Sequence, residues 1–237
     1  MVLYLVRHGC PDYPKDILLP EGWEQAKLVS ARFGVSGLDE IYASPQRRAR
    51  QTAQPTAELL GLPVTVEPWA EELGRESDTH WNDGKQKALA AVPVADYMDL
   101  RYRSLEAEEA LDKLDPIDGN GFAARYAFVS GGLDDFLKRL GYSRNDHGTY
   151  DPVAPNDRRV ALFCHAAVMR VMLSHLWNVP FQYLASTLAG YYTGVTAIYF
   201  DRASERDISP ALITYCDVGH LYAAGSPLTH HRDDIVF

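Results

Sequence analysis

The 237-residue chain has 32 acidic and 23 basic residues, a formal net charge of -9, and a composition that is 46% hydrophobic and 23% charged. This balance is typical of an enzyme-sized globular protein and excludes the disordered, collagen-like and disulfide-scaffold classes. An acidic protein repels polyanions at long range, so we expect neither nucleic acid nor an anionic membrane surface to be a partner. The length allows one large domain, or a core with an insertion.

No apolar run reaches the roughly 18 residues of a membrane-spanning helix, and Met1–Val6 leads directly into Arg7 without the pattern of a signal peptide. We therefore expect a cytoplasmic protein. The cysteines are far apart in the sequence, which predicts neither a disulfide framework nor a structural zinc site. They are Cys10, Cys164 and Cys216.

The first 73 residues alternate between strand and helix patterns. A continuous β-rich apolar run at residues 2–6 indicates a strand covered on both faces. Helical spacing of apolar residues from 21 to about 33 indicates an amphipathic helix, and residues 38–43 form a short strand pattern. This alternation favours an α/β fold with a parallel or mostly parallel sheet.

A second helix is expected directly after residue 43. Ser44 is the predicted N-cap, with Pro45 in the first turn. Pro55 is expected to kink or split the helix before Leu60, because proline removes a backbone donor and its ring clashes with the preceding turn. Residues 61–67 then predict a turn and another strand.

The pattern changes after Arg75. Residues 75–155 show no clear strand, and two stretches look helical, at 85–114 and 121–140. We interpret residues 1–237 as a single domain with a helical insertion at about 75–155. The core is predicted to be a three-layer sandwich with a mostly parallel central sheet flanked by helices. Its later elements are expected at 158–164 (strand), 166–177 (helix), 195–200 (strand) and 211–215 (strand).

Two histidines stand where a predicted buried strand leaves the sheet, and ligand sites in open α/β sheets lie at that carboxyl edge. His8 is followed by Gly9, which would let a ligand approach the backbone closely. His165 directly precedes a helix, whose free N–H groups and positive end would attract an anion. Together with Arg7 and Arg48, these groups could converge on one phosphate.

The sequence resembles the histidine phosphatase superfamily, also called phosphoglycerate-mutase-like. Three stretches carry the resemblance: residues 5–9 (Leu-Val-Arg-His-Gly), residues 44–53 (Ser-Pro-Gln-Arg-Arg-Ala-Arg-Gln-Thr-Ala) and residues 163–165 (Phe-Cys-His) after a strand. The resemblance covers residues 1 to about 73 and 158 to about 200. Cys10 departs from it, since many relatives have Glu or Gln there.

The resemblance implies a role for each matching position. His8 would be the nucleophile that takes the phosphoryl group. Arg7, Arg48 and His165 would bind the phosphoryl oxygens and neutralise developing charge, with His165 counted among the catalytic residues. Glu72 would protonate the leaving oxygen and later deprotonate the attacking water, with Glu71 as its close competitor.

We therefore expect a metal-independent phosphomonoester hydrolase that acts on a small phosphorylated substrate and needs no cofactor. A phosphoglycerate-type mutase is the nearest alternative, and an inactive phosphate-binding or scaffold protein is an alternative from another class. His80 and Trp81 fit no metal-site spacing, and no metal site is expected. The sequence leaves open the physiological substrate and the oligomeric state.

Overall fold

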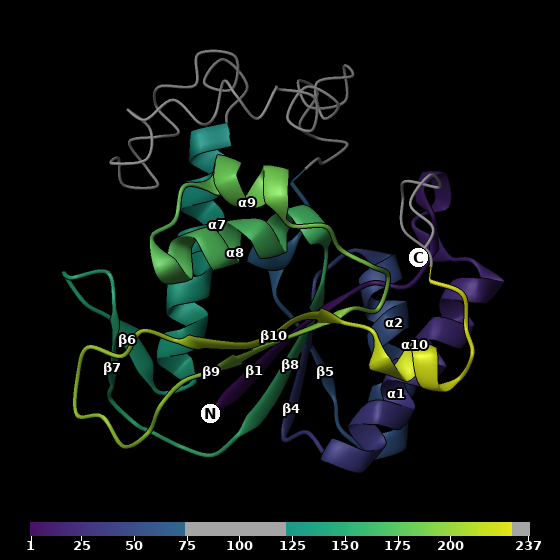
Figure 1. Cartoon of the computed structure of the whole chain (residues 1–237), viewed down its shortest axis with the longest axis horizontal. Helices are drawn as coiled ribbons and strands as arrows, with labels where there is room; N and C mark the ends of the chain where they lie inside the picture. The colour runs from purple at the N-terminus through teal and green to yellow at the C-terminus, as the bar shows by residue number, and fades with distance from the viewer. Residues whose placement is uncertain (74–121, 229–237) are drawn as a thin grey trace.

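The computed structural model describes residues 1–73 and 122–228. Its centre is a six-stranded sheet with the order β10-β9-β1-β8-β4-β5 (Figure 1). Strand pairs are parallel from β1 through β8 and β4 to β5, whereas β9 is antiparallel to both β1 and β10. The predicted mostly parallel sheet is confirmed. The strands are β1 (Val2–Arg7), β4 (Glu40–Ala43), β5 (Val64–Val66), β8 (Arg159–Cys164), β9 (Val195–Tyr199) and β10 (Ala211–Asp217).

Helices cover both faces of this sheet, which confirms the three-layer sandwich (Figure 1). Side chains of β8 alternate between two buried clusters, with Leu162 in one and Phe163 in the other. The first cluster lies under α7 and α8, and the second under α1 and α2. The helices are α1 (Pro20–Ser36), α2 (Arg47–Leu60), α7 (Phe122–Arg139), α8 (Ala166–Trp177), α9 (Phe181–Thr187) and α10 (Gly219–Ala223).

The helix α2 differs from its prediction at two points. It begins at Arg47 with Gln46 as its N-cap residue, so the predicted cap at Ser44 was wrong. The Ser44 hydroxyl instead accepts from the backbone N–H of Gln46 at 3.3 Å and contacts the ring of His165. The helix also continues through Pro55, so the proline does not split it, and the alternative of a kink stays a prediction. Its buried face against the sheet and α1 outweighs the loss of one backbone hydrogen bond.

Short strands occur where the sequence indicated none. A hairpin pairs β6 (Tyr142–Arg144) with β7 (Tyr150–Pro152), within the range that was expected to contain no strand. Tertiary contacts hold these three-residue strands, which are too short for a periodic signal. The Tyr142 and Tyr150 side chains are fully buried, and the backbone of Tyr150 exchanges two hydrogen bonds with Ile208, at 2.9 and 2.7 Å.

The helix expected at 121–140 is present as α7, and its inner face joins the core cluster that includes Tyr126, Leu133 and Phe136. The helix expected at 85–114 and the His80-Trp81 pair lie outside the described residues. The division into one domain with an insertion therefore stays a prediction. The smaller elements are β2 (Pro11–Asp12), η1 (Tyr13–Lys15), β3 (Ile17–Leu18) and η2 (Pro68–Ala70).

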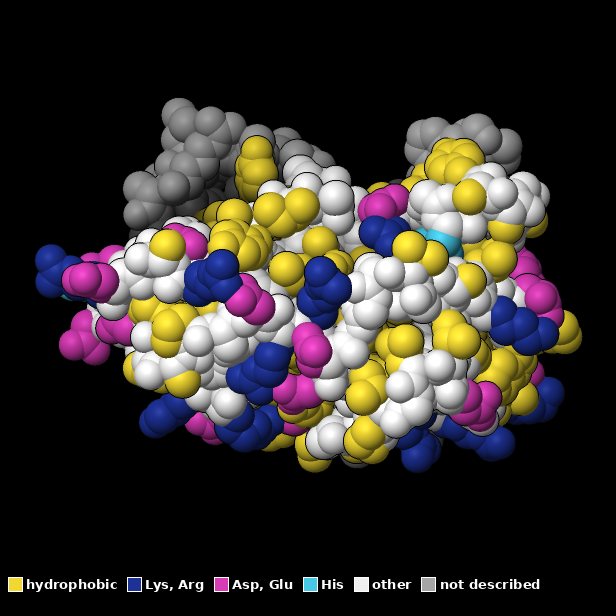
Figure 2. Space-filling model, turned by 90° about the horizontal axis from the view of Figure 1, so that it is seen from below, with side chains coloured by type: hydrophobic (Ala, Val, Ile, Leu, Met, Phe, Trp, Pro, Cys, Tyr) yellow, Lys and Arg dark blue, Asp and Glu magenta, His cyan; other side chains and the backbone are white. Residues whose placement is uncertain are grey.

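The surface shows no segregation of charge on the face drawn in Figure 2, where acidic and basic side chains are interspersed among polar and hydrophobic ones. Within the described part of the chain, none of the helices has the length and apolar character needed to cross a lipid bilayer.

Candidate active site

His8 and His165 meet at the carboxyl edge of the sheet. The parallel pairing of β1 with β8 sets Arg7 opposite Cys164, so each histidine is the next residue along its own strand. The backbone N–H of His8 donates to the Cys164 carbonyl at 3.0 Å, and the two ring centroids lie 5.1 Å apart. The strand register therefore brings together the two histidines that the sequence singled out.

His8 has the protonation pattern of a nucleophile. Its side chain is 2% exposed, and Nδ1 lies 2.8 Å from the carbonyl oxygen of Gly9. Because a carbonyl can only accept, Nδ1 must donate, which leaves the lone pair on Nε2. Burial lowers the pKa of His8 well below its usual value, and the charges of Arg7 and Arg48 lower it further. The imidazole is therefore neutral at physiological pH.

His165 is fully buried, and one of its ring nitrogens has no hydrogen-bond partner among the residues that the structure describes. Its Nε2 lies 2.7 Å from the Ser44 hydroxyl, which also accepts from the backbone N–H of Gln46. If the Ser44 proton goes to Nε2, then Nδ1 carries the hydrogen of the neutral ring. No described residue bonds to this Nδ1. Burial, followed by the charge of Arg48, lowers the pKa of His165 well below its usual value.

The two arginines are each held by one oxygen and stacked on one tyrosine. Arg7 donates Nη1 to the Gly190 carbonyl, and its guanidinium lies 4.3 Å from the ring centroid of Tyr192. Arg48 donates Nη1 to Asp16 at 2.6 Å and lies 5.5 Å from the ring of Tyr13. Both arginine residues are at least nine-tenths buried. These contacts restrict each arginine before any ligand binds.

Three buried nitrogen atoms in this site have no hydrogen-bond partner among the described residues. They are Nε of Arg7, Nε of Arg48 and Nδ1 of His165. A buried donor without an acceptor costs about 1–3 kcal/mol, so such groups persist where a ligand supplies the acceptor. Two of the donors are cationic, which favours an anion with several oxygens.

The carboxylate of Glu72 lies at the N-terminus of α8. Its Oε1 accepts from the backbone N–H groups of Leu73 at 3.0 Å and Val168 at 2.9 Å. Its Oε2 has one longer contact, 3.3 Å from the N–H of Ala167. The sequence led us to expect that this helix end attracts a ligand anion, but its first N–H groups already bind a protein carboxylate. The neighbouring Glu71 is turned so that its carbonyl accepts from Arg125 at 2.9 Å.

The motif on α2 supports the loop after β1. Thr52 Oγ1 accepts from the Gly9 N–H at 2.9 Å and donates to the carbonyl of Arg48 at 2.8 Å. Gln51 accepts from the N–H of Leu18 at 2.8 Å. A Cβ at Gly9 would lie 2.6 Å from the carbonyl oxygen of Gly22. The expectation that this glycine makes room for a ligand is therefore corrected, since its bare Cα makes room for α1.

The sequence and the fold both resemble those of known proteins. Residues 3–112 match the sequence profile of the histidine phosphatase superfamily, branch 1, and this range contains Arg7, His8, Arg48 and Glu72. Over this range the chain is similar to the histidine phosphatase superfamily. A protein of Hydrogenobacter thermophilus, provisionally named phosphoserine phosphatase 2, is 39% identical over 80 residues. That match spans 30% of this chain and 39% of the relative.

Solved structures share this fold. A phosphoserine phosphatase from Entamoeba histolytica, in complex with 3-phosphoglyceric acid, is 20% identical, with a TM-score of 0.63 and coverage of 93% of this chain and 98% of that one. A mycobacterial glucosyl-3-phosphoglycerate phosphatase complexed with VO3 is also 20% identical, with a TM-score of 0.58 and coverage of 90% and 98%.

The sequence did not reveal the side chains that hold Arg7 and Arg48. Tyr13 and Asp16 lie between the first predicted strand and the first predicted helix, and Tyr192 is far from both in sequence. None belongs to a motif that signals a site. In the described ranges 1–73 and 122–228, no cluster of three or more His, Cys, Asp or Glu side chains is placed to hold a metal ion.

Proposed function

We propose that this protein is a metal-independent phosphomonoester hydrolase that acts through a phosphohistidine at His8. One observation carries the proposal: the neutral, buried His8 lies in one site with the Nε–H groups of Arg7 and Arg48 and with Nδ1 of His165, none of which has a partner among the described residues. In the tautomer in which Ser44 donates to Nε2, Nδ1 of His165 is the third donor. A phosphoryl group fits this arrangement, because its oxygens can accept from all three donors while its phosphorus faces the imidazole.

In the first step, the Nε2 lone pair of His8 attacks phosphorus and the bond from phosphorus to the leaving oxygen breaks. Arg7, Arg48 and His165 hold the phosphoryl oxygens through Nε, Nε and Nδ1. Because the guanidinium groups are positioned in advance, they neutralise developing charge without having to reorganise. In this way the two arginines supply the positive charge that the transfer requires.

Glu72 is the proposed proton donor to the leaving oxygen. Its Oε2 is the better candidate to carry the proton, because Oε1 already accepts two shorter hydrogen bonds. In the second step, Glu72 takes a proton from water, the oxygen of the water bonds to phosphorus, and the bond from phosphorus to nitrogen breaks. Phosphate leaves and neutral His8 is restored.

The substrate is proposed to be a small phosphomonoester. The relatives named above include phosphoserine phosphatases and a glucosyl-3-phosphoglycerate phosphatase, so O-phosphoserine and glycerate phosphates are the first compounds to assay. We propose a single domain with an insertion at about 75–155, and the insertion borders the site in sequence directly after Glu72.

The test is phosphate release from p-nitrophenyl phosphate and from a panel of phosphorylated metabolites, measured with and without a chelator. We expect activity that survives the chelator and is lost in His8→Asn, which keeps a donor near the Gly9 carbonyl. Loss of activity with the chelator, or retained activity in His8→Asn, would contradict the proposal. Faster conversion of 3-phosphoglycerate to its 2-isomer than release of phosphate would identify a mutase instead.

A further inference from the structure

The loop of residues 188–194, between α9 and β9, holds Arg7 through both its backbone and its side chain. The backbone N–H of Arg7 donates to the Gly194 carbonyl at 3.1 Å. Its guanidinium donates to the Gly190 carbonyl and is covered by the ring of Tyr192. The position of this loop therefore determines where the Arg7 guanidinium points.

Three consecutive carbonyl groups of this loop are each bound by a different side chain. The Leu188 oxygen accepts from Nε of Arg170 at 3.1 Å and from Nη2 at 2.5 Å. The next oxygen, of Ala189, accepts from the Tyr215 hydroxyl at 2.7 Å. The third, of Gly190, accepts from Arg7. Because adjacent peptide planes share a backbone, fixing the first two carbonyl groups restricts the direction of the third.

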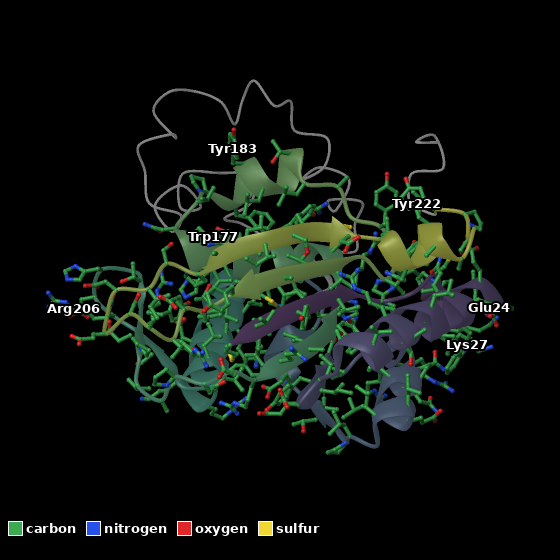
Figure 3. The ribbon with its side chains drawn as sticks, turned by 60° about the horizontal axis from the view of Figure 1, so that its bottom comes forward. Glu24, Lys27, Trp177, Tyr183, Arg206 and Tyr222 are labelled. Atoms are coloured by element: carbon green, nitrogen blue, oxygen red, sulfur yellow. The ribbon has the colours of Figure 1, made fainter. Side chains whose placement is uncertain are left out.

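Arg170 and Tyr215 come from separate elements of the fold. Arg170 lies on α8, whose N-terminus follows His165, and Tyr215 lies on β10. The start of β10 is itself anchored, since Trp177 Nε1 donates to the Pro210 carbonyl at 2.6 Å. Trp177 lies near that end of β10, whereas Tyr222, on α10, lies beyond the other end (Figure 3). The loop is thus fastened to two rigid elements.

Arg170 is bound to a carbonyl group and not to an acidic side chain. It forms no ion pair with the described residues, although burial lowers its pKa. An arginine in such surroundings is more often paired with a carboxylate, which offsets its loss of hydration. A partly buried cation thus holds the Leu188 carbonyl, which indicates that the site depends on the position of this loop.

We propose that Arg170 and Tyr215 are positioning residues that orient Arg7 for phosphoryl binding by fixing the carbonyl groups of Leu188 and Ala189. The proposal rests on the proposed function, because it takes Arg7 to bind the phosphoryl group. Neither side chain needs to touch the substrate. Their removal should therefore weaken phosphate binding and slow turnover only through Arg7.

Tyr215→Phe tests the proposal with the smallest change, because it removes one hydroxyl and keeps the ring. We expect inorganic phosphate, measured by calorimetry, to bind about 3- to 10-fold more weakly, as the loss of one hydrogen bond implies. Tyr199→Phe is the matched control on the neighbouring strand β9, where the hydroxyl donates to Asp201 at 3.3 Å. The control should bind phosphate as the wild type does.

Arg170→Met and Arg170→Lys extend the test, with kcat and KM measured on p-nitrophenyl phosphate and the Tm measured for each variant. We expect the methionine variant to bind phosphate at least as weakly as Tyr215→Phe. The lysine variant should recover part of the loss, since it keeps the charge and one donor. An Arg170→Met variant with a lower Tm but with the phosphate affinity of the wild type would contradict the proposal.

A double-mutant cycle with Arg7→Met separates positioning from general support of the fold. If Tyr215 acts through Arg7, then Tyr215→Phe should change phosphate affinity by less than about twofold once Arg7 is absent. An undiminished effect in the Arg7→Met background would overturn the inference while leaving the proposed function intact. A wild-type protein that binds no phosphate would instead contradict the proposed function, and the inference with it.

One further outcome would also overturn the inference. If Arg170→Met impaired only substrates that carry a carboxylate, such as O-phosphoserine, and spared p-nitrophenyl phosphate and inorganic phosphate, then Arg170 would contact the substrate directly. The positioning proposal predicts equal losses on both kinds of substrate.

Discussion

The ring centroids of His8 and His165 lie 5.1 Å apart. Each histidine is the first residue after its strand, and the two strands, β1 and β8, pair in parallel. Neither ring readily binds a second proton, because burial and the two nearby arginines favour the neutral form of both. The same geometry that provides a free lone pair on His8 therefore makes the folded state sensitive to acid.

Acid should destabilise the protein through these histidines. Their pKa values are lowered in the folded state, so below pH 6.5 the unfolded chain binds more protons than the folded one. The free energy of unfolding should then fall by about 1.4 kcal/mol per pH unit for each such histidine. Urea titrations between pH 7 and 4.5 measure this slope. In His8→Asn the slope should decrease by the share of one histidine, about 1.4 kcal/mol per pH unit. An unchanged slope would contradict the lowered pKa of His8 in the folded state.

Thr52→Val should damage both stability and activity. The substitution removes the acceptor of the buried Gly9 N–H and should lower the free energy of unfolding by about 1–3 kcal/mol. Phosphate binding should weaken as well, because Gly9 adjoins His8. Thr56→Val is the matched control one turn along α2, since the buried Thr56 hydroxyl has no partner among the described residues. It should be neutral or stabilising; similar losses in both variants would contradict the assigned role.

Gly9→Ala should impair folding or displace the loop after β1. The new Cβ would lie 2.6 Å from the carbonyl oxygen of Gly22, a backbone atom that cannot turn aside. Gly131→Ala, on the exposed side of α7, has nothing within 4 Å and should stabilise the protein by about 0.5–1 kcal/mol. Thermal unfolding compares the two variants. A Gly9→Ala protein with wild-type Tm and activity would refute the packing argument.

The proton donor can be tested by varying the leaving group. Glu72→Gln cannot transfer a proton to the leaving oxygen, so kcat on alkyl phosphates should fall about 100-fold or more. The kcat on p-nitrophenyl phosphate should fall much less, because its leaving group needs little protonation. Glu71→Gln should remain close to the wild type on both. Equal losses on both substrates in Glu72→Gln, or a loss confined to Glu71→Gln, would contradict the assignment.

The parts of the site that follow directly from strand order could be predicted from the sequence. His8 and His165 end parallel strands, so their meeting required only the β-rich runs before them and the rule that such ends share one edge. The side chains that hold Arg7 could not be predicted. Tyr192, in a loop, covers the Arg7 guanidinium, whereas Arg170 on a helix and Tyr215 on a strand bind carbonyl groups of that loop. Only tertiary packing brings these three side chains together.

Local patterns also misled where a residue had a second partner. Ser44 has the composition of a helix cap, yet its hydroxyl bonds to His165. Gly9 looked like a glycine that admits a ligand, yet it admits the backbone of α1. Both residues meet an element more than ten positions away, and a single sequence contains no signal for such contacts.

The most direct test of the account is to trap the intermediate. Substrate is mixed with Glu72→Gln, which should slow hydrolysis of the phosphorylated enzyme, and the reaction is stopped in alkali, where the phosphorus–nitrogen bond survives. After tryptic digestion, mass spectrometry should find one added phosphoryl group on peptide 8–15, in which His8 is the sole histidine. The label should be absent from His8→Asn. A phosphoryl group on another peptide, or turnover by His8→Asn, would contradict the central claim.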